Sequence, residues 1–284
     1  MSLCARQLQR MELATRRQLV RGNGIHSSSL VGNGEEPDGL RDWMPSDDYR
    51  TIDWNASART GRPNSLVTRK YFNDPDVTFS IVIDCAQRLN YGGFGSLMLS
   101  VDAALYAAIS IATLALWQND QVGVITTGSP TKRTPTTDDI RRIRKHLSEV
   151  QPGRDDAFVE VLQAFRKERE HAQVVVLISD FLGDGWQEPV TRLARMREVW
   201  AMQIIDPWDE HLPDVGEITM EGIPLNTSEE SVRQKYDYEK AVEQAEIARA
   251  LSCTRHMRLR TATRITPQLV ALFTQDHRRS IRAS

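Results

Sequence analysis

Four short apolar runs recur along the chain between positions 77 and 206. They lie at 77–84, 121–128, 173–180 and 199–206, and each is rich in Val and Ile without polar alternation. Strands of a sheet that is covered by helices on both faces have this pattern, because neither face meets water. We therefore expect four buried, parallel strands.

Helical patterns separate these runs. Apolar spacing predicts helices at 98–117, 138–150, 157–170 and about 188–197, with Thr137 capping the second of them. Strands that alternate with helices in this way predict right-handed crossovers. The expected fold is a doubly wound, mainly parallel α/β sheet of the Rossmann-like kind.

The pattern changes after position 206. Residues 216–227 predict a hairpin, and a T-x-x-E capping box formed by Thr227 and Glu230 predicts the start of a helix that runs to about Cys253. A last strand at 258–264 and a helix at 267–276 are expected to follow.

The first 75 residues have a different character. The amino terminus predicts an amphipathic helix, with Leu8, Met11, Leu13 and Leu19 near one side. Residues 22–75 are rich in Gly, Asn, Asp and Arg, and we expect them to be extended or looped. Because that is too long for a plain linker, the segment should pack on the α/β domain. We divide the chain into 1–75, an amino-terminal helix with an ordered extension, and 76–284, the α/β domain.

The composition is that of a globular protein and argues against binding to nucleic acid or to membranes through net charge. The 284 residues include 40% hydrophobic and 26% charged residues, with a formal net charge of -2. This balance favours a globular protein and gives no general attraction to nucleic acid or anionic membrane. Three scattered cysteines indicate a reducing compartment, and the amino terminus lacks the apolar core of a signal peptide. A cytoplasmic location is expected.

Residues 98–117 are nearly long enough to cross a bilayer. However, Asp102 interrupts the segment, and Ala, which contributes little to membrane insertion, supplies most of its apolar positions. A helix that is apolar all round is also what the interior of a large α/β domain requires. We favour the buried helix over a membrane span.

Three of the apolar runs end in an aspartate: Asp84, Asp180 and Asp206. Ligands of parallel sheets bind beyond the carboxyl ends of the strands, where clustered carboxylates suit magnesium. The alternative is that each Asp only begins a turn or caps a helix. The sequence contains no nucleophile elbow, phosphate-binding loop or H-E-x-x-H motif. Cys85 is better explained as a buried structural thiol than as a nucleophile.

The most specific stretch is LRDWMPSDDYRTIDWNASARTGRPNSLVTRKYFND, at 40–74. Its acidic, basic and tryptophan side chains can hold irregular backbone in place through Arg–carboxylate pairs and aromatic anchoring. RNA binding is a weaker alternative, because the acidic residues would repel phosphate. The residues to which we assign this structural role are Arg41, Asp47, Asp48, Arg50, Asp53, Trp54 and Arg59.

This stretch resembles the signature of domain-of-unknown-function family fifty-eight, and similar segments occur at 176–186, 204–216 and 225–236. The resemblance covers about 21–273. The family is similar to von Willebrand factor A domains, which usually carry a metal-ion-dependent adhesion site. The resemblance places Asp84 and Asp180 at the aspartates of that site. Ala86 and Arg88 stand at its two serines.

The resemblance also places Asp155 at the threonine of the adhesion site. Because hydroxyl ligands are lost, we expect Arg88 to replace the cation by pairing with Asp180 or Asp155, which leaves a degenerate site without metal. The competing model keeps weak magnesium binding at Asp84, Asp155 and Asp180, with Arg88 in solvent.

By the same resemblance, family members accompany MoxR-type AAA+ ATPases of bacteria and act with them in chaperone-like protein maturation. The expected function is therefore protein binding without catalysis, and no nucleic acid, membrane span or cofactor is expected. The alternative is a metal-dependent hydrolase that uses the strand-end carboxylates. The expected protein-binding face comprises Asp84, Arg88, Asp155, Asp180 and Asp206.

Overall fold

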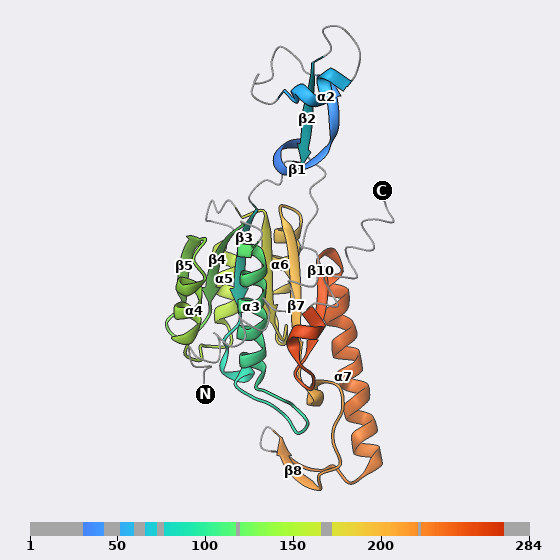
Figure 1. Cartoon of the computed structure of the whole chain (residues 1–284). Coiled ribbons are helices and arrows are strands. Elements are labelled where there is room, and N and C mark those ends of the chain that lie inside the picture. Colours follow the sequence, from blue (N-terminus) through green and yellow to red (C-terminus); the bar gives the residue numbers. More distant parts are fainter. Residues whose placement is uncertain are drawn as a thin grey trace. The chain divides into compact units, whose positions relative to one another are not determined.

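A computed structural model describes residues 31–42, 52–59, 66–72, 77–117, 120–165, 172–220 and 223–269 (Figure 1). The chain divides into two compact units: His26–Asp76, and a larger unit of Met1–Ile25 with Val77–Ser284. The predicted amino-terminal helix lies outside the described residues.

A six-stranded sheet forms the centre of the larger unit (Figure 1). Its order is β10-β7-β6-β3-β4-β5, and every neighbouring pair is parallel except β4 and β5. This confirms the expected α/β fold of the von Willebrand A-like kind. The strands are β3 (Thr78–Ile83), β4 (Gln121–Thr126), β5 (Lys132–Thr137), β6 (Val174–Ser179), β7 (Glu198–Ile205) and β10 (Arg255–Arg260).

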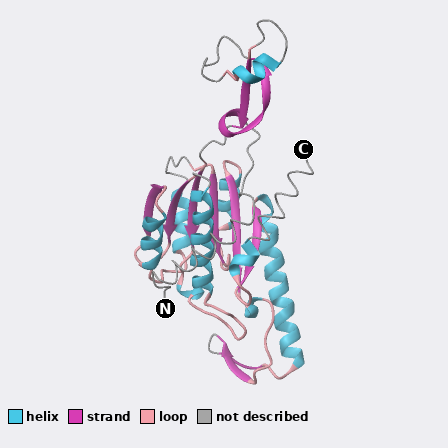
Figure 2. Cartoon of the chain, in the orientation of Figure 1, coloured by secondary structure: helices cyan, strands magenta, loops and turns pink. Residues whose placement is uncertain are grey.

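Helices cover both faces of this sheet, as Figure 2 shows. One hydrophobic cluster joins the sheet to α3 (Ser100–Trp117) and α4 (Ile140–Ser148). A second cluster joins it to α5 (Ala157–Phe165), α6 (Gln187–Ala194) and the carboxyl-terminal part of α7 (Glu230–Ala250). Successive strand residues alternate between the two clusters, because side chains of a strand point to opposite faces.

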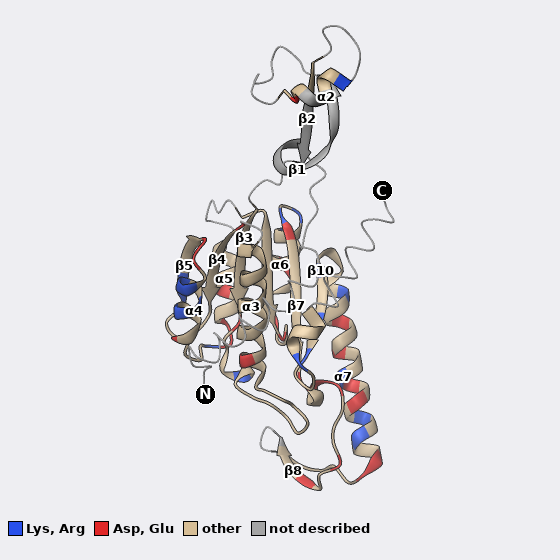
Figure 3. Cartoon of the chain, in the orientation of Figure 1, with Lys and Arg blue, Asp and Glu red and all other residues tan. Residues whose placement is uncertain are grey.

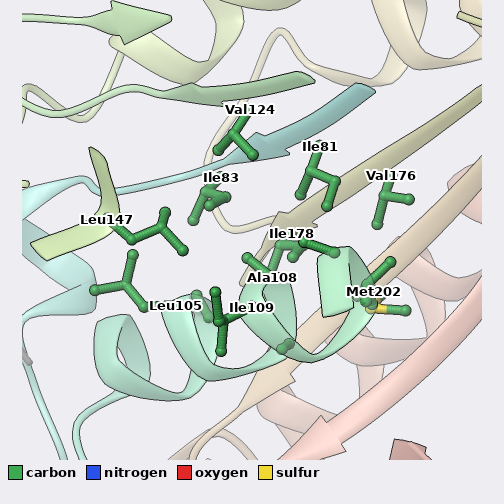
Figure 4. Close-up of a cluster of buried hydrophobic side chains, with 14 of the residues drawn as sticks. Ile81, Ile83, Leu105, Ala108, Ile109, Val124, Leu147, Val176, Ile178 and Met202 are labelled. Atoms are coloured by element: carbon green, nitrogen blue, oxygen red, sulfur yellow. The ribbon is translucent and has the colours of Figure 1, made fainter. Parts of the chain in front are cut away.

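Helix α3 lies in the centre of the first cluster. Its Leu105, Ala108 and Ile109 meet side chains of four strands (Figure 4). Among the described helices it is the one long and apolar enough to cross a membrane, and 83% of that window is buried in the protein. Its apolar composition is what this interior position requires.

Helix α7 contrasts with α3. Of its 21 residues only Ile247 is buried, near the carboxyl-terminal end. Acidic and basic residues are interspersed along the rest of the helix (Figure 3). Its amino-terminal half extends past the carboxyl edge of the sheet toward the hairpin of β8 (Glu217–Met220) and β9 (Ile223–Asn226), which confirms the expected hairpin.

Both predicted helix caps are wrong. Asp139, not Thr137, caps α4, and its carboxylate accepts from the amide of Arg141. The N-cap of α7 is Glu229, which makes no side-chain capping bond. Thr227 is buried, and its hydroxyl donates to the carbonyl of Gly216 (2.7 Å). This tertiary hydrogen bond occupies the hydroxyl that the sequence pattern assigned to the helix cap.

Two strands differ from the sequence prediction. β10 begins at Arg255, because Met257 and Leu259 are its buried positions, and the chain turns from Thr261. β5 was not predicted, since its buried positions are the two threonines Thr134 and Thr137. It is an edge strand that contains Pro135, a residue tolerated at sheet edges.

The smaller unit contains two paired strands and a helix in a segment that was expected to be extended or looped. β1 (Val31–Asp42) pairs antiparallel with β2 (Val67–Phe72), and α2 (Trp54–Arg59) contacts β2. The Ser57 hydroxyl donates to the carbonyl of Asp53 (2.8 Å) and accepts from the amide of Val67 (2.8 Å).

Part of the Arg–Asp–Trp motif lies in this unit's described residues. Arg41 belongs to β1, and the amide of Asp53 donates to the carbonyl of Val67 (2.9 Å). Trp54 is 66% exposed, so it is not a buried anchor, and Arg59 is exposed. The remaining motif residues, Asp47, Asp48 and Arg50, lie outside the described part.

Candidate functional site at the carboxyl edge of the sheet

Two of the predicted aspartates meet because their strands are neighbours. Asp84 follows β3 and Asp180 follows β6, which pairs with β3 in parallel. The amide of Asp84 donates to the carbonyl of Ile178 (2.8 Å), so the pairing extends to the position of the carboxylate. Both side chains therefore lie at the same edge of the sheet, where parallel α/β proteins bind ligands.

Asp155 reaches this edge through a loop. Ala86 and Gly153 form an isolated parallel bridge, in which the amide of Gln87 donates to the carbonyl of Gly153 (3.0 Å). The amide of Gly153 donates in turn to the carbonyl of Cys85 (2.8 Å). A side chain at position 153 would collide with the carbonyl oxygen of Thr127. The glycine thus allows the close approach that places Asp155 beside Arg88.

The Arg88 guanidinium lies among three carboxylates. Its Nε donates to Asp180 Oδ2 (3.0 Å), and its Nη2 donates both to Asp180 Oδ1 (3.0 Å) and to Asp84 Oδ2. Its Nη1 donates to the Asp155 carbonyl (3.1 Å) and is 3.4 Å from Asp155 Oδ1. Arg88 therefore pairs with all three carboxylates. A planar guanidinium suits this arrangement, because several N–H groups point outward from one charge.

Burial differs sharply across this cluster. The side chain of Asp84 is fully buried and that of Asp180 is 8% exposed, whereas Arg88 is 23% and Asp155 65% exposed. Burial raises the pKa of Asp84 to about 6, although the nearby Arg88 charge acts in the opposite direction. Only Arg88 and Asp155 offer their side chains to a partner.

Two hydroxyl groups that we did not predict complete the cluster. Ser179 donates to Asp84 Oδ2 (2.8 Å) and accepts from the amide of Phe181 (3.0 Å). Thr127 accepts from the amide of Cys85 (2.9 Å), and its hydroxyl is 3.4 Å from Asp84 Oδ1. The sequence feature that could have identified Ser179 and Thr127 is a polar residue at the end of an apolar strand run, and this feature by itself is unspecific.

Phe181 has a backbone conformation that is rare for residues other than glycine. Its φ is 58°, and its side chain is buried against Phe158 and Trp186 at centroid distances of 6.0 and 5.1 Å. This left-handed conformation costs about 1 to 3 kcal/mol and persists where the surrounding packing enforces it. The turn comes directly after Asp180 and helps to fix the position of that carboxylate.

Asp206 has a separate role from the other predicted residues. It is 2% exposed and caps a short 3-10 helix, Pro207–Asp209. Its carboxylate accepts from the amide of Gly93 (3.1 Å) and the hydroxyls of Ser96 and Thr261 (3.1 Å for Thr261). Asp206 therefore holds the 91–97 loop against the ends of β7 and β10, and among the described residues no hydrogen bond or ion pair joins it to Arg88.

The residues of the Arg88 cluster do not fit a divalent cation. Ala86 and Arg88 supply no hydroxyl ligand, and oxygens of all three carboxylates accept from the guanidinium. Within the described residues, no group of three or more His, Cys, Asp or Glu side chains is arranged to hold a metal ion. Cys85 is fully buried, and burial raises the pKa of its thiol, which disfavours the nucleophilic thiolate.

The order of the mostly parallel sheet and the helices on both of its faces define an α/β protein of von Willebrand A-like fold. The chain belongs to the family described as Protein of unknown function DUF58, whose sequence profile matches residues 39–246.

Mycobacterial proteins are similar to this chain over most of its length. Uncharacterized protein Rv1480 of Mycobacterium tuberculosis and Uncharacterized protein Mb1516 of Mycobacterium bovis are each 27% identical over 246 residues. The match covers 81% of this chain and 75% of each relative. A solved structure of an uncharacterized membrane spanning protein from Vibrio fischeri has 14% identity. The match covers 70% of this chain and 98% of that chain, with a TM-score of 0.22.

Proposed function

We propose that this protein is a non-catalytic protein-binding module of the bacterial cytoplasm, and that its partner is a MoxR-type AAA+ ATPase. The observation that carries the proposal is the position of the Arg88 guanidinium among Asp84, Asp155 and Asp180. An adhesion domain with metal uses a cation at this edge to organise the strand-end loops. Here a side chain of the protein itself does so, and the docking face is formed without added metal.

The rigidity of the edge supports this proposal. Asp84 and Asp180 are held by Arg88 and by Ser179, and the loop at Gly153 is bonded to the strand-end segment. A preformed surface binds partners with a smaller entropy loss than one that must first become ordered. Asp155 and Arg88 then provide the exposed polar part of the docking face.

The hydrolase alternative receives less support from this geometry. A carboxylate that serves as a general base must be free to accept a proton from water or substrate. Asp84 and Asp180 are buried, and their oxygens already accept hydrogen bonds from Arg88 and Ser179. No observation in the described residues favours a substrate pocket at this cluster, so we do not pursue this second function.

The test is a binding assay with the purified MoxR-type ATPase from the same organism, in its nucleotide-free form. We expect micromolar or tighter binding that persists in excess chelator. Asp155→Arg should weaken binding at least about tenfold, because it reverses an exposed charge at the docking face.

Asp138→Arg is the matched control. Asp138 is exposed and follows β5, which runs antiparallel to β4 and so ends at the opposite edge of the sheet. Its substitution should change affinity by less than about twofold. Absence of wild-type binding at about 100 µM, or binding that requires magnesium, would contradict the proposal.

A further inference from the structure

The loop at 91–97 exposes three large apolar side chains within seven residues. Tyr91 is 44% exposed, Phe94 74% and Leu97 61%. Single exposed apolar residues are normal, but adjacent ones on a protein surface indicate an interaction site. None of these residues belongs to the Arg88 cluster.

The contacts of the loop show that it is held in place. The amide of Gly93 and the Ser96 hydroxyl donate to the buried Asp206 carboxylate, and the amide of Leu97 donates to the carbonyl of Thr261 (2.9 Å). A side chain at position 93 would collide with the ring of Trp208 and with Asp206. A loop this firmly attached holds Phe94 in solvent instead of letting it fold back on the domain.

Phe94 also forms one wall of a pocket. The pocket has a volume of about 220 Å³, and its other apolar walls come from Pro207, Trp208, Pro213 and Ala262. This volume is below the 300 to 1,000 Å³ or so of sites for small organic ligands. It suits one apolar side chain of another protein. Aromatic residues beside such pockets commonly dominate binding energy.

Three titratable side chains line the rim of the pocket: Arg260, Glu210 and His211. Arg260 pairs with Glu210 through two bonds (2.9 and 3.0 Å), and Arg258 contacts the same carboxylate at 3.3 Å. His211, also on the rim, pairs with Asp237 (3.0 Å). The formal charges of the two arginines are matched by Glu210 and Asp237, and Arg260, which is 47% exposed, is the cation that lines the pocket. The complementary group is a carboxylate.

We propose that this pocket binds an aliphatic or aromatic side chain of a partner protein, next to an acidic residue that Arg260 contacts. The inference rests on the protein-binding function proposed above and names the chemistry of the partner segment. The apolar side chain enters between Phe94 and Trp208. The carboxylate then contacts the exposed side of the Arg260 guanidinium.

The first experiment measures binding of the ATPase to single variants. Phe94→Ser and Arg260→Glu should each weaken binding at least about tenfold, because hot-spot residues of this kind contribute that much. Met196→Ser is the matched control. Met196 is 68% exposed and lies just before β7 begins, at the amino edge of the sheet, and its substitution should have less than about a twofold effect. Wild-type affinity in Phe94→Ser and Arg260→Glu would overturn the inference.

The second experiment does not depend on the ATPase. The peptides acetyl-Gly-Leu-Asp-Gly-amide and acetyl-Gly-Leu-Lys-Gly-amide are titrated into the full chain and followed by the NMR signal of the Trp208 indole N–H. We expect the Asp peptide to shift this signal with at least threefold higher affinity than the Lys peptide, and the shift to vanish in Phe94→Ser. No shift up to about 10 mM peptide would overturn the inference. Peptide binding without ATPase binding would instead reject the proposed partner and keep the pocket.

Discussion

Replacing Arg88 by methionine tests whether its guanidinium holds the strand-end cluster together. The substitution keeps much of the side-chain length but removes every hydrogen bond that the guanidinium donates to Asp84, Asp155 and Asp180. Asp84 is fully buried, so it would remain as an uncompensated buried carboxylate. Removing one partner of a buried ion pair costs about 3 to 5 kcal/mol.

The expected loss lies at the lower end of that range. The Arg88 side chain is 23% exposed, so water can enter and solvate part of the cluster in the variant. We expect the free energy of unfolding at pH 7.5 to fall by about 3 kcal/mol in Arg88→Met. The loss should be smaller at pH 5.5, because Asp84 without its arginine takes up a proton more readily and no longer remains as a buried charge.

The assay is urea unfolding followed by circular dichroism and tryptophan fluorescence. Arg154→Met is the matched control, since Arg154 also pairs with two carboxylates, Asp156 and Glu160, but all three side chains are more than 60% exposed. This control should leave stability within error of the wild type, because exposed ion pairs contribute little. If Arg88→Met and Arg154→Met unfold at the same urea concentration, Arg88 does not organise the cluster.

Two further predictions follow from the same edge of the sheet. Asp84 has a pKa of about 6 in the folded protein against an ordinary value of 3.8, so the folded state binds this proton more tightly, and stability falls as pH rises through that window. Urea unfolding should therefore show that the stability of Asp84→Asn relative to wild type rises by about 2 kcal/mol between pH 4 and 7. Parallel pH profiles of the two proteins would contradict the assigned pKa. Gly153→Ala should lower the free energy of unfolding by about 2 kcal/mol or more, because its methyl group would collide with the Thr127 carbonyl. Thermal unfolding indistinguishable from wild type would show that the loop carrying Asp155 is not so closely packed.

Most of the central sheet could be predicted from the sequence, because buried parallel strands carry a strong local signal. The runs that end in Asp84 and Asp180 are rich in Val and Ile, and the aspartate is the last residue of each run. Strand β5 carries no such signal, since an edge strand with buried threonines has the composition of a loop. The local sequence pattern also gave a wrong helix cap at Thr227. The hydroxyl of Thr227 donates to the carbonyl of Gly216, which lies 11 positions earlier in the chain.

The site was predictable only in part. Asp155 was assigned by family resemblance, since nothing local to its loop shows that Gly153 brings it to β3. The roles of Ser179 and Thr127 were not predicted, because a single hydroxyl residue at the end of an apolar strand run is common. The sequence placed Asp206 with Asp84 and Asp180 because all three end strands. In the structure Asp206 bonds the 91–97 loop, a contact between segments more than 100 residues apart.

The central proposal is that Arg88 takes the place of the cation in the metal-ion-dependent adhesion site that this edge of the sheet resembles. Its most direct test is calorimetric titration of the chelator-treated protein with magnesium and then manganese, with Arg88→Ser measured in parallel. The account predicts no binding heat in the wild type and measurable binding in the variant, where Asp84 and Asp180 regain free oxygens beside a new hydroxyl. Micromolar binding of either metal by the wild type would contradict it.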